Sequence, residues 1–198
     1  MSERPSIGFL RQLRENHALT VMIDGELVPG SVPILLSMLD AETDPQKRWE
    51  LQMHIISECS IADRTTAAVK YAVARFREFG DVTSLMGYAR ALVANNEFED
   101  GLKCARDAVA LAIKQQALIN SAACDYVREA IKTGSVEAVN QALDVLADST
   151  EMPRTSDSAF ETDWVDAAEA LGADAEMIAW VREVAAWQLA KRSPSKGG

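Results

Sequence analysis

Three residues at helical spacing, Glu50, His54 and Glu58, form the pattern in this sequence that comes nearest to a chemical site. Positions i, i+4 and i+8 share one face of a helix, so two carboxylates and an imidazole would be within reach of one another. Such a set can ligate a metal ion when a facing helix adds ligands. The next expected helix, over residues 63–79, carries mainly basic residues in its interior. We therefore expect an ion-pair ladder between these helices, with a metal site as the alternative.

The three cysteines, Cys59, Cys104 and Cys124, indicate structural thiols. Their number is odd and no Cys-x-x-Cys pair occurs, which argues against a disulfide framework and a structural zinc site. The base nearest to Cys59 in sequence is His54, which lies five residues away and off its face. We expect buried, unreactive thiols in a reducing, cytoplasmic compartment.

Motifs that carry catalysis are missing from the sequence. It contains no Gly-rich phosphate loop, no Gly-x-Ser-x-Gly elbow and no His-Glu-x-x-His zinc helix. With only two histidines, any Ser-His or Cys-His arrangement would have to use one of them. The sequence thus favours a non-enzymatic protein without a cofactor.

Composition predicts an all-α fold. The 198 residues are 48% hydrophobic and 25% charged, which is ordinary for a globular domain. Much of the apolar content is alanine, the best helix former, whereas aromatics are only 6% and long β-branched runs are missing. Arginines interrupt the apolar residues near the start of the chain, so we expect no secretory signal. No stretch approaches the roughly 20 apolar residues of a membrane span.

The net charge of −10 is concentrated in residues 133–181, which carry eleven acidic residues and one basic residue. This segment would repel phosphates, so we expect no nucleic-acid partner. It would attract a basic protein or peptide, although a solvated acidic face that aids solubility gives the same pattern.

Helical periodicity and capping signals define the expected elements. Asp24-Gly25 between two short apolar runs predicts a small β-hairpin near residues 20–28. Asp63 is expected to cap one helix, and Ser158 with Glu161 to form a capping box for another. The remaining helix starts are Asp44-Pro45, Asp81, Ser135 and Asp174, and the stops are Gly80, Gly134 and Gly172. The expected helices span residues 6–17, 31–39, 45–59, 63–79, 82–95, 97–115, 117–133, 135–148, 158–171 and 174–191.

Short connections between these helices make consecutive helices antiparallel neighbours. We expect one domain, in which an N-terminal segment over residues 1–43 packs on a helical-repeat body over residues 44–148. A polar loop over residues 149–157, a helix pair over residues 158–191 and a frayed tail over residues 192–198 would complete it.

Residues 85–113 have the pattern of a helix-turn-helix repeat unit. Large apolar residues recur in the first helix, two asparagines mark the turn, and small residues stand where the helices would cross (Leu85, Tyr88, Ala89, Leu92, Asn95, Asn96, Phe98, Gly101 and Ala108). The segment resembles a tetratricopeptide repeat, a unit of about 34 residues. Ala105 and Ile113 depart from the family pattern, and the units on either side match it less well. The fold is then a short α-solenoid, or else an irregular helical bundle.

The resemblance implies a scaffold whose first helices line a concave face that receives a peptide or a protein. On this template, the exposed positions of the first helix include Arg90 and Asn95. These two residues are therefore candidate partner-binding residues.

Three tryptophans near the end of the chain, Trp164, Trp180 and Trp187, could also bind a partner. They accompany an apolar stripe on the last helix (Ile178, Val181, Val184, Ala185 and Leu189). Tryptophan is enriched at interface hot spots, so this region could dock a partner or a second copy of the chain. The alternative is that the tryptophans close the core.

Three functional hypotheses follow. The first is a helical-repeat adaptor or scaffold that binds another protein, with the tryptophans ringed by acidic residues. The second is a small helical enzyme or metal-binding protein that uses Glu50, His54 and Glu58. The third is an acidic inhibitor or nucleic-acid mimic that acts through residues 133–181.

Overall fold

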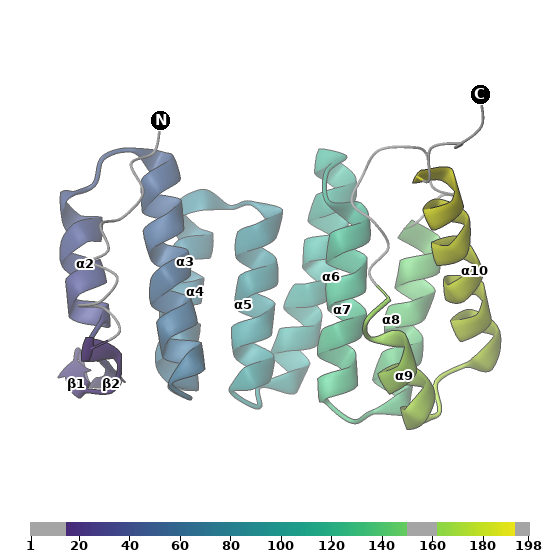
Figure 1. The fold of residues 1–198 in the computed structure, drawn as a ribbon, viewed down its shortest axis with the longest axis horizontal. Helices are drawn as coiled ribbons and strands as arrows, with labels where there is room; N and C mark the ends of the chain where they lie inside the picture. Colours follow the sequence, from purple (N-terminus) through teal and green to yellow (C-terminus); the bar gives the residue numbers. More distant parts are fainter. Residues whose placement is uncertain (1–14, 150–161, 193–198) are drawn as a thin grey trace. The chain divides into compact units, whose positions relative to one another are not determined.

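The computed structural model describes residues 15–149 and 162–192, and almost all of the elements in these ranges are helices (Figure 1). The predicted all-α class with a small hairpin is confirmed. The chain divides into two compact units, Met1–Gly80 and Asp81–Gly198, here called unit 1 and unit 2. The boundary falls inside the segment predicted to be one helical-repeat body. No helix in the described ranges combines the length and apolarity that a bilayer crossing requires.

Unit 1 contains the predicted β-hairpin. Strands β1 (Thr20–Ile23) and β2 (Glu26–Pro29) pair antiparallel, with Val21 opposite Val28. Asp24 and Gly25 both have positive φ angles, of 50° and 84°, as a type I′ turn requires. Strand β2 packs against the helices of the unit and buries Val28 completely. The predicted helix over residues 6–17 lies mostly outside the described residues.

Three helices follow the hairpin in unit 1: α2 (Val32–Ala41), α3 (Pro45–Ile61) and α4 (Thr65–Phe79). Helix α3 packs on both of the others. Asp44 caps α3 as predicted, since its carboxylate accepts hydrogen bonds from the backbone N–H groups of Gln46 and Lys47.

The predicted cap of α4 is wrong. Asp63 has a left-handed φ of 58°, and Arg64 takes the N-cap position without a side-chain hydrogen bond. Asp63 instead closes the end of α3, where its N–H and that of Arg64 donate to the carbonyls of Ser60 and Cys59. A left-handed residue just beyond a helix commonly satisfies the last carbonyls in this way.

Helices α3 and α4 are joined by a polar contact around Glu78. Arg48 Nε donates to Glu78 Oε1 over 2.7 Å, and Gln52 Nε2 donates to Glu78 Oε2 over 2.6 Å. The Arg48 hydrogen bond, helped by the one from Gln52, holds the pKa of Glu78 below its usual 4.5. Nearby, the buried guanidinium of Arg75 lies over the Trp49 ring, 4.4 Å from its centroid.

A carboxyl whose pKa is lowered by folding stabilises the fold above its unfolded pKa, and this contribution is lost as pH falls through the folded pKa. We predict that the stability of the chain falls as pH drops below about 4.5, the ordinary pKa of this carboxyl, and that Glu78→Gln makes this fall shallower. Urea unfolding followed by circular dichroism at stepped pH measures it. Glu50→Gln, at an exposed glutamate of the same unit, is the control; an unchanged slope in Glu78→Gln would contradict the assignment.

Unit 2 consists of six described helices: α5 (Val82–Ala94), α6 (Phe98–Gln115), α7 (Ile119–Lys132), α8 (Val136–Ser149), α9 (Val165–Leu171) and α10 (Ala175–Arg192). Each of α5 to α8 packs on the next along the chain, and α9 packs on α10 (Figure 1). Alternate helices also touch, α5 with α7, α7 with α9, and α6 with α8. The first helices α5, α7 and α9 therefore form one layer, and α6 and α8 belong to a second.

Small side chains allow the layers of unit 2 to approach closely. Nine buried alanines, at positions 89, 105, 108, 112, 122, 123, 130, 142 and 168, belong to its core. Gly101 of α6 lies against α5, where an added Cβ would be 2.6 Å from Val93 Cγ2 and 3.2 Å from the Ala89 carbonyl. The turn before α6 holds Asn96 at a φ of 63°, and Phe98 opens α6 as predicted. The small residues at this crossing are confirmed as a packing requirement.

We predict that Gly101→Ala destabilises unit 2. Overpacking costs about 1–3 kcal/mol, and the better helix propensity of alanine offsets only about 1 kcal/mol of it. The midpoint of urea unfolding should fall accordingly. Ala110→Gly, at an exposed position of α6, measures the propensity difference alone; a Gly101→Ala protein as stable as wild type would show that the crossing can relax.

The last part of unit 2 agrees with the capping signals but not with the predicted length of α9. Ser135 and Asp174 cap α8 and α10 through backbone N–H bonds, and Gly172 ends α9 with a φ of 87°. Residues 162–164 are not helical, so α9 begins at Val165 rather than at Ser158. The proposed Ser158–Glu161 capping box and nearly all of the 149–157 loop lie outside the described residues.

The connection between α6 and α7 is short and uses two left-handed residues that are not glycine. Gln116 has a φ of 53° and Leu118 a φ of 59°. Between them, the Ala117 N–H donates to the Ala112 carbonyl over 3.1 Å. Left-handed backbone at a leucine is uncommon and unfavourable, so the flanking helices must hold it.

Candidate functional site

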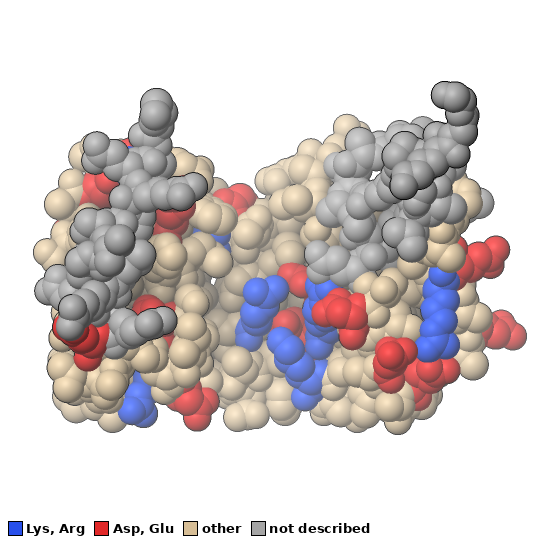
Figure 2. Space-filling model, in the orientation of Figure 1, with Lys and Arg blue, Asp and Glu red and all other residues tan. Residues whose placement is uncertain are grey.

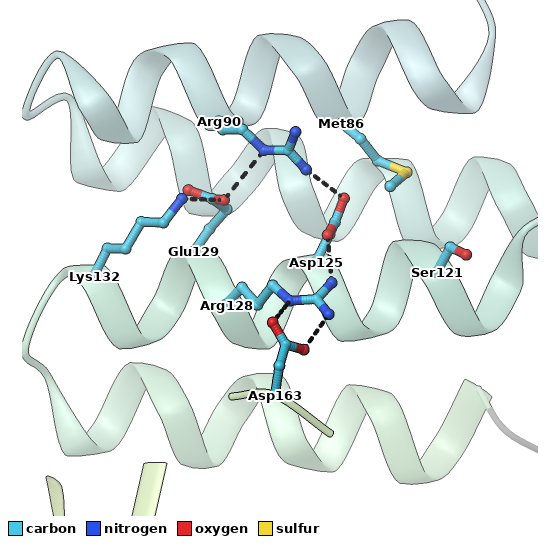
Figure 3. Close-up of a pocket in the computed structure, with 8 residues that line it drawn as sticks. All are labelled: Met86, Arg90, Ser121, Asp125, Arg128, Glu129, Lys132 and Asp163. Atoms are coloured by element: carbon cyan, nitrogen blue, oxygen red, sulfur yellow. Dashed lines mark hydrogen bonds and ion pairs between the residues drawn. The ribbon is translucent and has the colours of Figure 1, made fainter. Parts of the chain in front are cut away.

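A charged cleft of about 430 Å³ opens on the first-helix layer of unit 2 (Figure 3). Helix α5 contributes Met86 and Arg90, and Asp163 comes from the residues just before α9. Helix α7 contributes the rest of the lining (Ser121, Asp125, Arg128, Glu129 and Lys132). Three basic and three acidic side chains therefore meet there, and Figure 2 shows such charges interleaved on this face of unit 2.

The acidic side chains that α7 contributes form the floor of the cleft. The side chain of Glu129 is only 3% exposed and that of Asp125 12%. A carboxylate removed from water to this extent is stable only when cations and hydrogen-bond donors compensate its charge. Arg90, Arg128 and Lys132 supply that compensation.

The cations reach the floor from two helices. Arg90 Nη2 donates to Asp125 Oδ2 over 2.9 Å, and Arg90 Nε lies 3.7 Å from Glu129 Oε1. Lys132 Nζ donates to the same Glu129 oxygen over 2.6 Å. Arg90 and Lys132 keep about half of their surface, 55% and 48%, open to solvent. Their heads therefore form the outer part of the cleft, above the buried carboxylates.

Arg128 extends the network toward α9. Its Nη1 donates to Asp125 Oδ1 over 2.9 Å, and its Nε and Nη2 form a bidentate pair with Asp163 (Figure 3). The hydrogen bond from Arg128 lowers the pKa of Asp163 from its ordinary value. A continuous chain of ion pairs thus joins α5, α7 and the start of α9.

One acceptor of the cleft is unsatisfied. Glu129 Oε2 is buried and has no hydrogen-bond partner among the described residues. Leaving a buried carboxylate oxygen without a donor costs free energy. The floor of the cleft therefore contains one carboxylate oxygen whose hydrogen bonding is incomplete.

The structure separates the two predicted partner-binding residues of the repeat. Arg90, on α5, lines the cleft. Asn95 does not line it; it follows the last turn of α5, and its side chain donates to Glu97 Oε1.

The three tryptophans have different environments. Trp164 is 3% exposed and belongs to the core of unit 2, so its ring is not offered at the surface. Trp180 is partly buried against the same core, and Trp187 is 41% exposed. Trp164 is therefore a core residue, which was the alternative to partner binding. Trp187 exposes the larger part of its side chain to solvent.

The Glu50, His54 and Glu58 face is not assembled as a metal site. His54 and Glu50 are exposed, and Gln46 Nε2 donates to Glu50 over 3.2 Å. Glu58 Oε2 accepts from the Ser31 hydroxyl and lies 2.7 Å from His17 Nδ1. Within residues 15–149 and 162–192, no group of three or more His, Cys, Asp or Glu side chains could hold a metal ion.

The predicted ion-pair ladder between α3 and α4 is also wrong in its residues. Glu58 faces His17 and Ser31 rather than the basic residues of α4. Arg48 and Glu78 form an ion pair that joins these two helices. The signs are reversed because α3 presents its arginine, not its glutamates, to α4.

Burial suppresses the reactivity of the cysteines. Burial raises the pKa of the Cys59 thiol to about 12, and it also raises that of Cys104. Cys124 is buried on α7. A thiol must ionise to act as a nucleophile, so Cys59 is unsuited to catalysis.

We predict that Cys59 of the native protein reacts with Ellman's reagent about a thousandfold more slowly than an ordinary thiol, whose pKa is about 8.5. All three cysteines should react at once in denaturant. The Cys59→Ser variant identifies its share of the absorbance change, and rapid native labelling of Cys59 would contradict the burial of this thiol.

Sequence reasoning missed most of the cleft, although α7 carries a signal for it. Asp125, Arg128, Glu129 and Lys132 follow one another at spacings of three, one and three residues, which gives one helix face with alternating charge. Such a face is ordinarily solvated. Asp163 had no signal, because its place beside Arg128 depends on how the chain returns before α9.

No protein-family model, no curated protein and no solved structure matches this chain.

Proposed function

We propose that unit 2 is a helical-repeat interaction module, similar to tetratricopeptide repeats, that binds a segment of another protein in the charged cleft. The observation that carries this proposal is the position of the cleft. Its lining comes from α5 and α7, which are successive first helices of the stack, and from Asp163 just before α9, the next one. In helical-repeat scaffolds this layer is the one that receives partners.

The size and lining of the cleft also support a binding role. A volume of about 430 Å³ lies within the range of roughly 300–1,000 Å³ that is usual for ligand sites. Ion pairs between side chains of different elements fix the positions of its charged groups. These groups are therefore ordered before a partner binds. Preorganised groups lose less conformational entropy on binding.

A non-enzymatic role fits the chemistry of these side chains. The described cleft has no histidine or cysteine among its lining residues. Its carboxylates are engaged by cations, which suits recognition better than proton transfer. A cytoplasmic setting, with a reduced thiol at each cysteine, is part of this proposal.

The test begins with a display selection of short linear peptides on the full chain, followed by calorimetry of the enriched peptides. Ser121→Trp places a large ring on the cleft wall and should weaken binding by at least about tenfold, or about 1.4 kcal/mol. Trp187→Ala should leave binding unchanged. Thermal melts of both variants check folding, and Met86→Trp serves as a second cleft-filling variant.

Three results would overturn the cleft as the binding site. They are a failure to enrich any peptide, binding that survives both cleft-filling variants, and binding that is lost only in Trp187→Ala. The last result would move the interface to α10, where light scattering would show whether a second copy of the chain is the occupant.

A further inference from the structure

The β-hairpin of unit 1 has one strand edge without a partner. Because its turn has two residues, hydrogen-bonded and non-hydrogen-bonded residue pairs alternate along the ladder. The Gly30 N–H donates to the Leu19 carbonyl over 2.8 Å, which fixes the phase of this alternation. Thr20 and Met22 therefore turn their backbone N–H and carbonyl groups away from β2. No hydrogen bond joins these backbone groups to another residue of the described ranges.

The two edges of the hairpin are protected to different degrees. Pro29 lies at an outward-facing position of β2 and has no N–H group, and β2 packs against α3 and α4. Proline and a covering helix are common ways in which proteins block a strand edge. Strand β1 has the sequence Thr-Val-Met-Ile, without proline, glycine or a charged residue. Such residues favour strands, so the edge of β1 is a template for a further strand.

The outer face of the hairpin is apolar beside this edge. Met22 is 70% exposed, and Leu27, which lies opposite it on β2, is 47% exposed. Directly opposed residues of an antiparallel pair point to the same face, so the two side chains form one patch. A strand added to β1 would cover part of Met22 and would also satisfy the outward backbone groups.

The edge of β1 is complementary to a second copy of itself. An antiparallel pair of β1 strands with Val21 at the two-fold axis places Thr20 of each copy opposite Met22 of the other. Both residues have outward backbone groups, so each of these pairs exchanges two hydrogen bonds. The combined sheet has β2 at both of its outer edges, where Pro29 opposes further addition. The arrangement therefore closes as a symmetric dimer.

Charges at the two ends of β1 favour the antiparallel direction. Arg64 Nη2 lies 3.4 Å from Thr20 Oγ1 at the start of the strand. Asp24 follows the end of the strand, and its side chain is 78% exposed although Lys70 Nζ lies 3.5 Å away. In the antiparallel pair, Arg64 of each copy comes within about two residues, or roughly 7 Å along the strand, of Asp24 of the other. A parallel pair would instead bring like charges together.

We propose that unit 1 forms a symmetric dimer, in which β1 pairs antiparallel with β1 of a second copy of this chain. The pairing is centred on Val21, and it joins the two hairpins into one sheet. It uses a surface of unit 1 and does not depend on the function proposed for the cleft of unit 2. Each dimer carries two copies of that cleft.

Sedimentation equilibrium of the full chain, from about 1 μM to 1 mM, tests the association. The mass should rise with concentration from one chain toward two and should not exceed two. Met22→Lys places a charge beside the edge, as natural edge strands do, and should weaken the association at least about tenfold. Ile113→Lys, at an exposed isoleucine of α6, is the matched control and should leave it unchanged. Circular dichroism checks that both variants fold.

Cysteine cross-linking tests the register. Val21→Cys places two thiols in a directly opposed, non-hydrogen-bonded pair, whose Cα atoms lie about 4.5 Å apart and within reach of a disulfide. The Cα atoms of Thr20 in the two copies would be roughly 8 Å apart, which is beyond that reach. Mild oxidation should therefore give covalent dimer much faster in Val21→Cys than in Thr20→Cys. The wild-type protein measures the background from the three native thiols.

Four results would overturn the proposed dimer. A mass of one chain at every concentration excludes it, and so does association that Met22→Lys leaves unchanged. Cross-linking of Thr20→Cys as fast as that of Val21→Cys contradicts the pairing about Val21, and growth beyond two chains contradicts a closed assembly. The cleft-filling variant Ser121→Trp should associate like wild type, so that failure of the dimer and failure of the proposed function are distinguished.

Discussion

A carboxylate that leaves water must be met by positive charge, and Asp125 and Glu129 impose this requirement on unit 2. Both side chains lie on α7, and both are largely buried. Arg128 and Lys132 pair with these carboxylates from the same helix, whereas Arg90 reaches Asp125 from α5. The buried carboxylates of α7 therefore require that α5 packs beside α7, because α5 brings the guanidinium of Arg90 to them.

The close packing of the helices also determines the position of Arg90 in the cleft. Gly101 and the alanines of the core let α5 and α6 cross with little space between their backbones. A larger residue at that crossing would push α5 outward and change the reach of Arg90. Apolar packing therefore sets the distances between the charged groups of the cleft.

Local signals were sufficient for most of the fold. Caps and tight turns depend on only a few neighbouring residues, so they can be recognised directly in the sequence. Examples are the Asp44-Pro45 helix start, the Asp24-Gly25 turn and the Asn96 turn. Asp63 does not cap α4, because its backbone N–H donates to the Ser60 carbonyl and so closes the end of α3. Whether Asp63 closes α3 or caps α4 depends on the length of the connection between these helices. Capping preferences of single residues give no information about that length.

The site was harder to predict because it is made by packing. The repeat template suggested Arg90, which lines the cleft, whereas the glutamates of α3 have helical spacing but do not face basic residues of α4. Spacing along a helix predicts which side chains share a face. It does not say whether that face meets a cation, a carboxylate or solvent, and this choice separated the cleft on α7 from the unassembled set on α3.

The connection between α6 and α7 has a consequence for how these two helices are ordered. Gln116 and Leu118 hold left-handed backbone that costs of order 1 kcal/mol each, so the turn does not stabilise itself. The packing of the helices on either side determines its path. The relative placement of α6 and α7 therefore comes from the contacts between the helices and not from the sequence of the linker.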